Sequence, residues 1–267
     1  MRGPTQMSDS PAACYRFAEL TAPRIRALVK TAVTVLPIGA VEQHGQHLCT
    51  GTDTFINEGL QERLFARPPQ GEFVFLPTLW LGASEHHRDY GGTLSLKPTT
   101  YIRILVDLIT ELAEAGHRKL ILLNSHGGNH APMQAALAEC ARAVTGLDCF
   151  VAGVTYWEVA EARWKENIPA LTSTRMGHAC ELETSMIWAL KPELPKAPAV
   201  GESPFPKALD AFKSAALPFP YLTRQGHMGA PAQASEDKGK ALLDEAAAGL
   251  REYLSHFYQT RLPRPNH

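Results

Sequence analysis

Short apolar runs alternate with longer segments of helical periodicity along most of this chain. The runs predict buried strands at 33–38, 73–76, 119–123 and 149–154. The run at 119–123 (KLILL) is almost wholly apolar, as is typical of a parallel strand covered on both faces. Helical spacing predicts helices at 102–112, 132–140, 178–190 and 236–258. This alternation predicts one doubly wound α/β domain with a mostly parallel central sheet.

The predicted domain spans residues 14–260. Residues 1–13 are small and polar, which predicts a disordered N-terminal tail, and residues 261–267 form a short C-terminal tail. A proline-rich stretch at 192–220 is expected to run over the surface of the domain.

Composition narrows the class of protein. The 267 residues carry a net charge of −1 and are 45% hydrophobic, so no basic surface for nucleic acid or anionic membrane is expected. The five cysteines are scattered and odd in number, which favours reduced thiols in the cytoplasm. No secretion signal and no apolar run near the roughly 18 residues of a membrane span is present. We expect a soluble cytoplasmic protein.

The most informative polar residues follow the first predicted strand. Glu42 and His44 are two apart in an extended segment, so their side chains can point to one side. Asp53 follows them closely. Carboxylate and imidazole ligands together suit Zn, Mn or Fe better than Ca or Mg. The alternative, a coincidental Glu-x-His pair in the core or on the surface, is common.

Ligands of a parallel α/β sheet gather beyond the carboxyl ends of its strands. His126 follows the strand at 119–123 and precedes two glycines, although a helix-capping turn would explain the same residues. His178 and Glu181 are three apart at the start of a predicted helix and would share one face, with Glu183 on another. The alternative there is a solvated first turn in which acids favour the helix dipole.

Charge favours two cations over one. The five candidate ligands Glu42, His44, Asp53, His126 and Glu181 bring three negative charges. Two divalent cations and a bridging hydroxide would balance them, whereas one cation would leave a buried negative charge, which is costly. Asp53 is the natural bridge between the two cations.

Four segments in order resemble the signatures of the creatininase (creatinine amidohydrolase) family. They are LPIGAVEQHGQHLCTGTD at 36–53, NSHGGN at 124–129, GHACELETS at 177–185 and, more weakly, GHMGAP at 226–231. The resemblance implies a three-layer α/β/α fold and a homo-oligomer, a hexamer built as a trimer of dimers. It also implies two divalent metal ions, Zn²⁺ and/or Mn²⁺, with Fe²⁺ as an alternative.

The resemblance also assigns roles to single residues. Glu42, Asp53 and His126 would hold one metal ion. His44, Asp53 and Glu181 would hold the other, and His178 would transfer a proton. Creatininase has a glutamate and a tyrosine where this chain has Gly128 and Gly127, which argues against strict creatininase activity.

The implied function is hydrolysis of a C–N bond in a small amide, cyclic amide or formamide by a metal-activated water. Alternatives are hydrolytic ring opening of a cyclic ketone such as a keto-inositol and peptide trimming in redox-cofactor maturation. We expect substrate contacts at Ser84, His87, Gly127 and Trp157. The chain lacks a GxGxxG motif after its first strand, which argues against dinucleotide binding. It also lacks any Cys-rich or His-rich tract, which argues against metal storage.

Overall fold

A parallel sheet of five strands forms the centre of the computed structural model, which describes residues 12–194, 196, 200–207 and 217–261. The strand order is β1-β3-β2-β4-β5. The strands span Ala12–Arg16 (β1), Val33–Ile38 (β2), Gly71–Phe75 (β3), Lys119–Asn124 (β4) and Phe150–Thr155 (β5). All paired neighbours run parallel, as the apolar runs predict.

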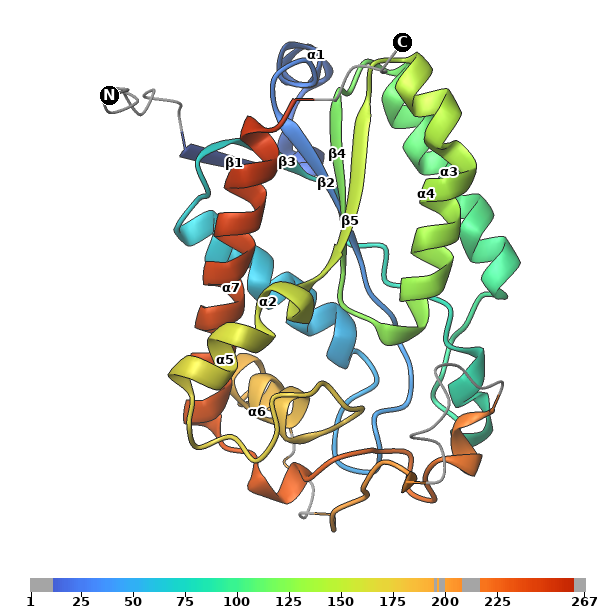
Figure 1. The fold of residues 1–267 in the computed structure, drawn as a ribbon, viewed down its shortest axis with the longest axis vertical. Helices are drawn as coiled ribbons and strands as arrows, with labels where there is room; N and C mark the ends of the chain where they lie inside the picture. Colours follow the sequence, from blue (N-terminus) through green and yellow to red (C-terminus); the bar gives the residue numbers. More distant parts are fainter. Residues whose placement is uncertain (1–11, 195, 197–199, 208–216, 262–267) are drawn as a thin grey trace, which may run out of the picture.

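Helices cover both faces of the sheet and give three layers (Figure 1). One face carries α2 (Thr52–Ala66), α5 (Glu161–Asn167), α6 (Glu181–Leu190) and α7 (Glu236–Gln259). The other carries α3 (Pro98–Glu114) and α4 (His130–Gly146), and the short α1 (Ala22–Leu28) packs near β3. In β4, Ile121 and Leu123 enter the first core, and Leu120 and Leu122 enter the second. The predicted α/β/α architecture is confirmed.

The structure adds elements that periodicity did not predict. β1, α1, α2 and α5 are absent from the prediction, and α2 lacks a clear apolar stripe because polar Asn57 and Gln61 are buried in it. Ala12 and Ala13 pair with Gly71 and Glu72, so the predicted tail at 1–13 ends inside a strand. Residues 1–11 and 262–267 lie outside the described residues.

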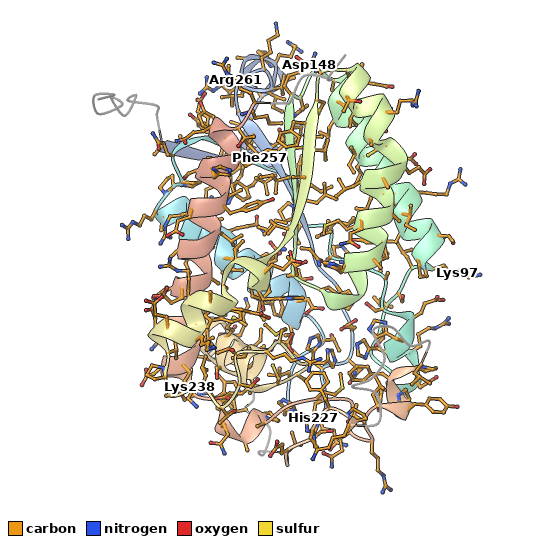
Figure 2. All side chains as sticks on the ribbon, viewed as in Figure 1. Lys97, Asp148, His227, Lys238, Phe257 and Arg261 are labelled. Carbon is orange, nitrogen blue, oxygen red and sulfur yellow. The ribbon has the colours of Figure 1, made fainter. Side chains whose placement is uncertain are left out.

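The order of the strands fixes where a site can form. The chain leaves β2, adds β3 on one side, and later adds β4 on the other side of β2. Loops leaving β2 and β4 therefore part in opposite directions and open a crevice at the carboxyl ends of these strands. In Figure 2, His227 and Lys238 lie at this end of the molecule, and Asp148 and Arg261 lie at the other.

Within the described residues, no helix combines the length and apolar character that crossing a membrane would require.

Candidate metal centre

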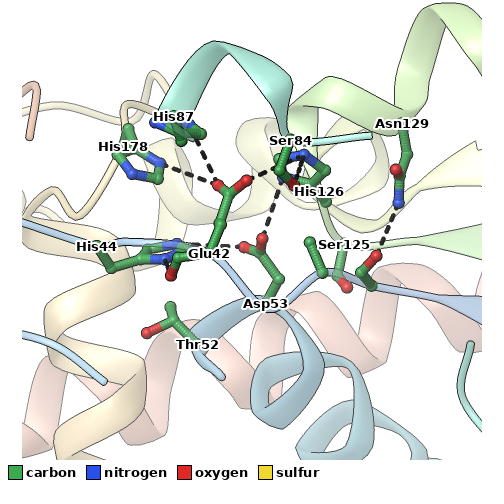
Figure 3. A network of polar contacts seen from close by, with 12 residues as sticks. Glu42, His44, Thr52, Asp53, Ser84, His87, Ser125, His126, Asn129 and His178 are labelled. Carbon is green, nitrogen blue, oxygen red and sulfur yellow. Dashed lines mark hydrogen bonds and ion pairs between the residues drawn. The ribbon is translucent and has the colours of Figure 1, made fainter. Parts of the chain in front are cut away.

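A cluster of buried acids and histidines fills the crevice between the carboxyl ends of β2 and β4 (Figure 3). Its side chains come from elements that are far apart in the sequence. Its members are Glu42 and His44 after β2, Asp53 in the first turn of α2, His86 and His87 in a 3-10 helix, His126 after β4, His178 before α6 and Glu183 within α6.

Glu42 lies at the centre of the cluster and is fully buried. Its Oε2 is 3.3 Å from Nε2 of His126, and its Oε1 is 3.3 Å from Nε2 of His87 and 3.7 Å from Nδ1 of His178. One carboxylate thus faces three imidazoles.

Asp53 lies between His44 and His126, the two histidines predicted from the sequence to be metal ligands. Its Oδ1 is 3.3 Å from Nε2 of His44, and its Oδ2 is 3.1 Å from Nδ1 of His126. The other nitrogen of His44, Nδ1, donates to the backbone carbonyl of Glu42 at 3.1 Å. In the neutral ring that bond places the proton on Nδ1 and leaves the Nε2 lone pair facing Asp53, as in histidine ligands of metals.

Burial moves the pKa values of the cluster far from their ordinary range. It raises the pKa of Glu42 and that of Glu183 to about 7. Burial lowers the pKa of His44, but the Asp53 carboxylate outweighs it and raises the value to about 10. Likewise the charge of Glu42 outweighs burial at His126 and raises its pKa to about 9. The pKa of Asp53 falls because the charge of His44 outweighs burial.

Several polar atoms of the cluster are buried and have no hydrogen-bond partner. They are both carboxylate oxygens of Glu42, Oδ2 of Asp53, Oε2 of Glu183 and Nε2 of His44. Leaving such atoms unpaired costs about 1–3 kcal/mol each, more when they are charged. All are good ligand atoms for a divalent cation. The residues present therefore fit a metal centre.

The geometry offers more than one position for a cation. Among the residues that the structure describes, four groups of three side chains have ligand atoms within 4.8 Å of one another. They share members and are Glu42-His44-Asp53, His44-His178-Glu183, Glu42-His86-His126 and Glu42-His87-His178. If ionised, the three acids Glu42, Asp53 and Glu183 would bring three negative charges, which two divalent cations and a hydroxide would balance.

Metal binding to this cluster is expected to release protons. In the metal-free protein Glu42 and Glu183 titrate near pH 7, and His44 and His126 hold protons above it. Cations bind the deprotonated forms, so affinity should rise as pH increases from about 6 to 9. Titration calorimetry with Zn²⁺ in buffers of different ionisation enthalpy measures this release; binding without protons at pH 7 would contradict these pKa directions.

The structure does not bring Glu181, a predicted metal ligand, into the cluster. Its Oε1 forms a 2.6 Å ion pair with Nζ of Lys238. Its Oε2 accepts hydrogen bonds from the backbone N–H of Thr172 at 3.0 Å and from the Thr172 hydroxyl. Glu181 faces a separate pocket, and Glu183 takes the place in the cluster.

The reason lies in where α6 begins. His178 and Glu181 would share a helix face only if His178 were helical, but α6 starts at Glu181. His178 lies in an antiparallel bridge with Met228, and Ala179 has a φ of +48° that turns the chain before the helix. His178 therefore reaches the cluster from extended backbone. From α6 it is Glu183, two residues after Glu181, whose carboxylate reaches the cluster.

His178 is held among aromatic rings. Its ring centroid is 4.3 Å from His44, 4.2 Å from His87 and 4.9 Å from Phe219. Burial, assisted by the charge of His44, lowers the pKa of His178 well below its ordinary range. The imidazole is therefore neutral in this environment.

Both adjacent histidines of the 3-10 helix Glu85–Tyr90 reach the cluster. His86 stacks on His126 with centroids 5.9 Å apart, and His87 stacks on His178. Ser84, expected to contact substrate, is fully buried, and its hydroxyl lies 3.2 Å from Nε2 of His126.

A cavity of about 230 Å³ opens over the cluster. His87, Gly127 and Trp157, the other expected substrate contacts, all line it. Phe219, Met176 and Met228 complete the lining near them. A Cβ at Gly127 would meet nothing within 4 Å, so the missing side chain widens the cavity. A Cβ at Gly128 would lie 2.3 Å from the carbonyl oxygen of Ala83, so that position has no room for a glutamate without backbone movement.

Comparison with known proteins identifies the family. The model of the creatininase (creatinine amidohydrolase) family matches residues 18–254. The chain is 30% identical over 238 residues to a creatinine amidohydrolase from Pseudomonas putida, and the match covers 82% of this chain and 87% of that protein. It is also 30% identical over 190 residues to a 3-dehydro-scyllo-inosose hydrolase from Thermotoga maritima. That match covers 69% of this chain and 58% of the Thermotoga protein.

The fold is shared as well. A solved creatininase carrying a tryptophan-to-alanine substitution superposes with a TM-score of 0.78 at 25% identity, over 92% of this chain and 100% of that one. The match therefore extends over nearly all of the sheet and both helical layers. This chain belongs to the creatininase family and is a hydrolase of that family.

Proposed function

We propose that this chain hydrolyses a C–N bond of a small amide, cyclic amide or formamide with the help of two divalent metal ions. The observation that carries the proposal is the set of buried ligand atoms without partners around Glu42, Asp53 and Glu183. A folded protein retains buried carboxylate oxygens that lack hydrogen-bond partners when a ligand satisfies them.

The residues divide into two sets of ligands. Glu42, Asp53 and His126 would hold one cation, and His44, Asp53 and Glu183 the other, with Asp53 shared. Zn²⁺ and Mn²⁺ suit these oxygen and nitrogen ligands, with Fe²⁺ as an alternative. When bound, the ions lower the pKa of water towards about 7 and polarise the substrate carbonyl.

His178 would move the proton that the reaction releases. Its Nδ1 is 3.7 Å from Oε1 of Glu42, and the residue lines the cavity where substrate would bind. A neutral imidazole at this place can take a proton from the attacking water and hand it to the leaving nitrogen. Phe219 and His87 pack against the ring.

The cavity favours a compact substrate without a phosphate group. Among the described residues, no lysine or arginine lines it. The nearby Arg88 is exposed and pairs with Glu85, and Arg175 lies over Phe205 in the neighbouring pocket. Trp157 and Phe219 provide flat apolar walls that suit a small planar ring or acyl group.

His178→Asn is expected to keep both metal ions and to lower kcat by about a hundredfold to ten-thousandfold, as for loss of a general acid–base group. Elemental analysis and steady-state kinetics measure the two effects. His256→Asn, at an exposed histidine of α7 that does not line the cavity, is the matched control and should change neither. An unchanged kcat in His178→Asn would exclude proton transfer by this ring.

A screen of the metal-loaded protein against creatinine, formamides, lactams and keto-inositols tests the bond type. We expect turnover of an amide or formamide. Ring opening of a keto-inositol is the second candidate, because the similar Thermotoga maritima protein is named as a hydrolase of such a compound. If the metal-loaded protein hydrolyses none of the compounds with C–N bonds, the proposed C–N hydrolysis is wrong.

We further propose a homo-oligomer in the cytoplasm, a hexamer by analogy with the family. The five cysteines are all free, which suits a reducing compartment. Light scattering after size exclusion measures the oligomeric state.

A further inference from the structure

The side chain of Gln43 is buried between His87 and His178. Its Oε1 accepts a hydrogen bond from the backbone N–H of Gly45 at 2.9 Å. A backbone N–H can only donate, so this contact fixes which end of the amide is oxygen. Gly226, with a φ of +76°, closes over the same oxygen: a Cβ there would lie 2.3 Å from it. The amide nitrogen must therefore face the two histidines.

The amide nitrogen determines the proton position on His87. Nε2 of Gln43 is 2.8 Å from Nδ1 of His87. An amide NH₂ has only donors, so Nδ1 of His87 must accept and cannot carry a proton. In the neutral ring the proton then lies on Nε2, which is 3.3 Å from Oε1 of Glu42. His87 presents an N–H group to the cluster.

The backbone of Gln43 determines the proton position on His178. Nε2 of His178 is 2.8 Å from the carbonyl oxygen of Gln43, which can only accept, so this Nε2 carries the proton. A second contact, 3.1 Å to the amide nitrogen of Gln43, then joins two donors. In the opposite tautomer, lone pairs of His178 Nε2 and of the Gln43 carbonyl oxygen would face each other at 2.8 Å. That repulsion is worse than two donors facing each other at 3.1 Å. His178 therefore turns an Nδ1 lone pair towards Glu42.

We propose that Gln43 is a positioning residue that makes His87 a hydrogen-bond donor and His178 a proton acceptor at the same cavity. The roles in turnover rest on the proposed function; the proton positions do not. Because Nε2 of His87 holds a proton, His87 cannot serve as a metal ligand through that atom, although it lies near Glu42 and His178. It would instead donate to a carboxylate or substrate oxygen, while His178 takes the proton from water.

NMR of zinc-loaded protein labelled with ¹⁵N-histidine tests the inference, since one-bond and two-bond ¹H–¹⁵N couplings identify the protonated nitrogen of each ring. His87→Asn and His178→Asn assign the two sets of signals. We expect both rings to be protonated at Nε2 in the unsubstituted protein. Detection of the proton on Nδ1 of either ring would overturn the proposal, whether or not the protein is active.

Gln43→Glu is the decisive variant because it keeps the size of the side chain and replaces the donor by an acceptor. His87 should then be protonated at Nδ1, whereas His178 should keep its Nε2 proton because the backbone carbonyl remains. Gln46→Glu, an exposed position three residues away, adds the same charge and should leave both rings unchanged. An unaltered His87 signal in Gln43→Glu would contradict the role of Gln43. Failure of the proposed function would show separately, as inactivity with the expected proton positions.

Discussion

Replacing Glu42 with glutamine is expected to remove most bound metal and to lower hydrolysis by about a thousandfold, as several kcal/mol of lost metal assistance implies. Glu42 is fully buried, both of its oxygens lack hydrogen-bond partners, and it lies within reach of His126, His87 and His178. An amide binds divalent cations far more weakly than a carboxylate. Elemental analysis and initial rates at saturating metal measure both losses.

The fold should tolerate this change. Burial raises the pKa of Glu42 to about 7, so above that pH the ionised carboxylate destabilises the metal-free protein. The Glu42→Gln substitution removes the charge and keeps the size, so the metal-free variant should melt at an equal or higher temperature at pH 8. A lower melting temperature together with unchanged metal content would show that Glu42 stabilises the fold and does not bind metal.

Glu183→Gln and Glu181→Gln are expected to differ sharply although the two positions are two residues apart. Glu183→Gln should empty one site, so that the metal content falls from about two ions to about one. Glu181→Gln should keep both ions, because Glu181 is satisfied by Lys238 and Thr172. It should instead cost about 1–3 kcal/mol of unfolding free energy through the weakened buried ion pair.

This pair of variants separates two arrangements of the site. Elemental analysis gives the number of ions, and urea unfolding gives the stability. Loss of one ion in Glu181→Gln with full occupancy in Glu183→Gln would reverse the assignment made here. Because each substitution removes one carboxylate from the same helix, each serves as the control for the other.

The architecture could be predicted because a sheet covered by helices on both faces gives a simple pattern of apolar residues in its strands and helices. β4 is apolar along nearly all of its length, and α3 has Tyr101, Leu105 and Ile109 on one face. β1 was not predicted since it is a short edge strand whose side chains are only partly buried. α2 was not predicted because polar Asn57 and Gln61 are buried in it and erase the amphipathic pattern.

The candidate site could be predicted where a ligand follows directly from a strand end. Glu42, His44 and His126 come from the loops at the switch point of the sheet, which topology alone brings together. Glu181 was chosen over Glu183 because helical spacing was extended to a histidine that lies outside the helix. The spacing of Glu181 and Glu183 cannot reveal which faces the cluster until the first residue of α6 is known.

Gln43 and His86 could not be assigned from the sequence for a different reason. Gln43 lies between two candidate ligands, and alternation in an extended chain would direct its side chain away from them. In the structure Gly45 has a φ of +63°, and the chain turns there so that the amide lies between two rings. Neither residue type nor spacing shows this turn.

The most direct test of the metal centre is a crystal structure of metal-loaded protein with anomalous data collected at the zinc or manganese edge. We predict two peaks about 3.5–4 Å apart, one between Glu42 and His126 and the other between His44 and Glu183, with Asp53 touching both. A single peak, no peak in the crevice, or a peak bound by Glu181 would contradict the account.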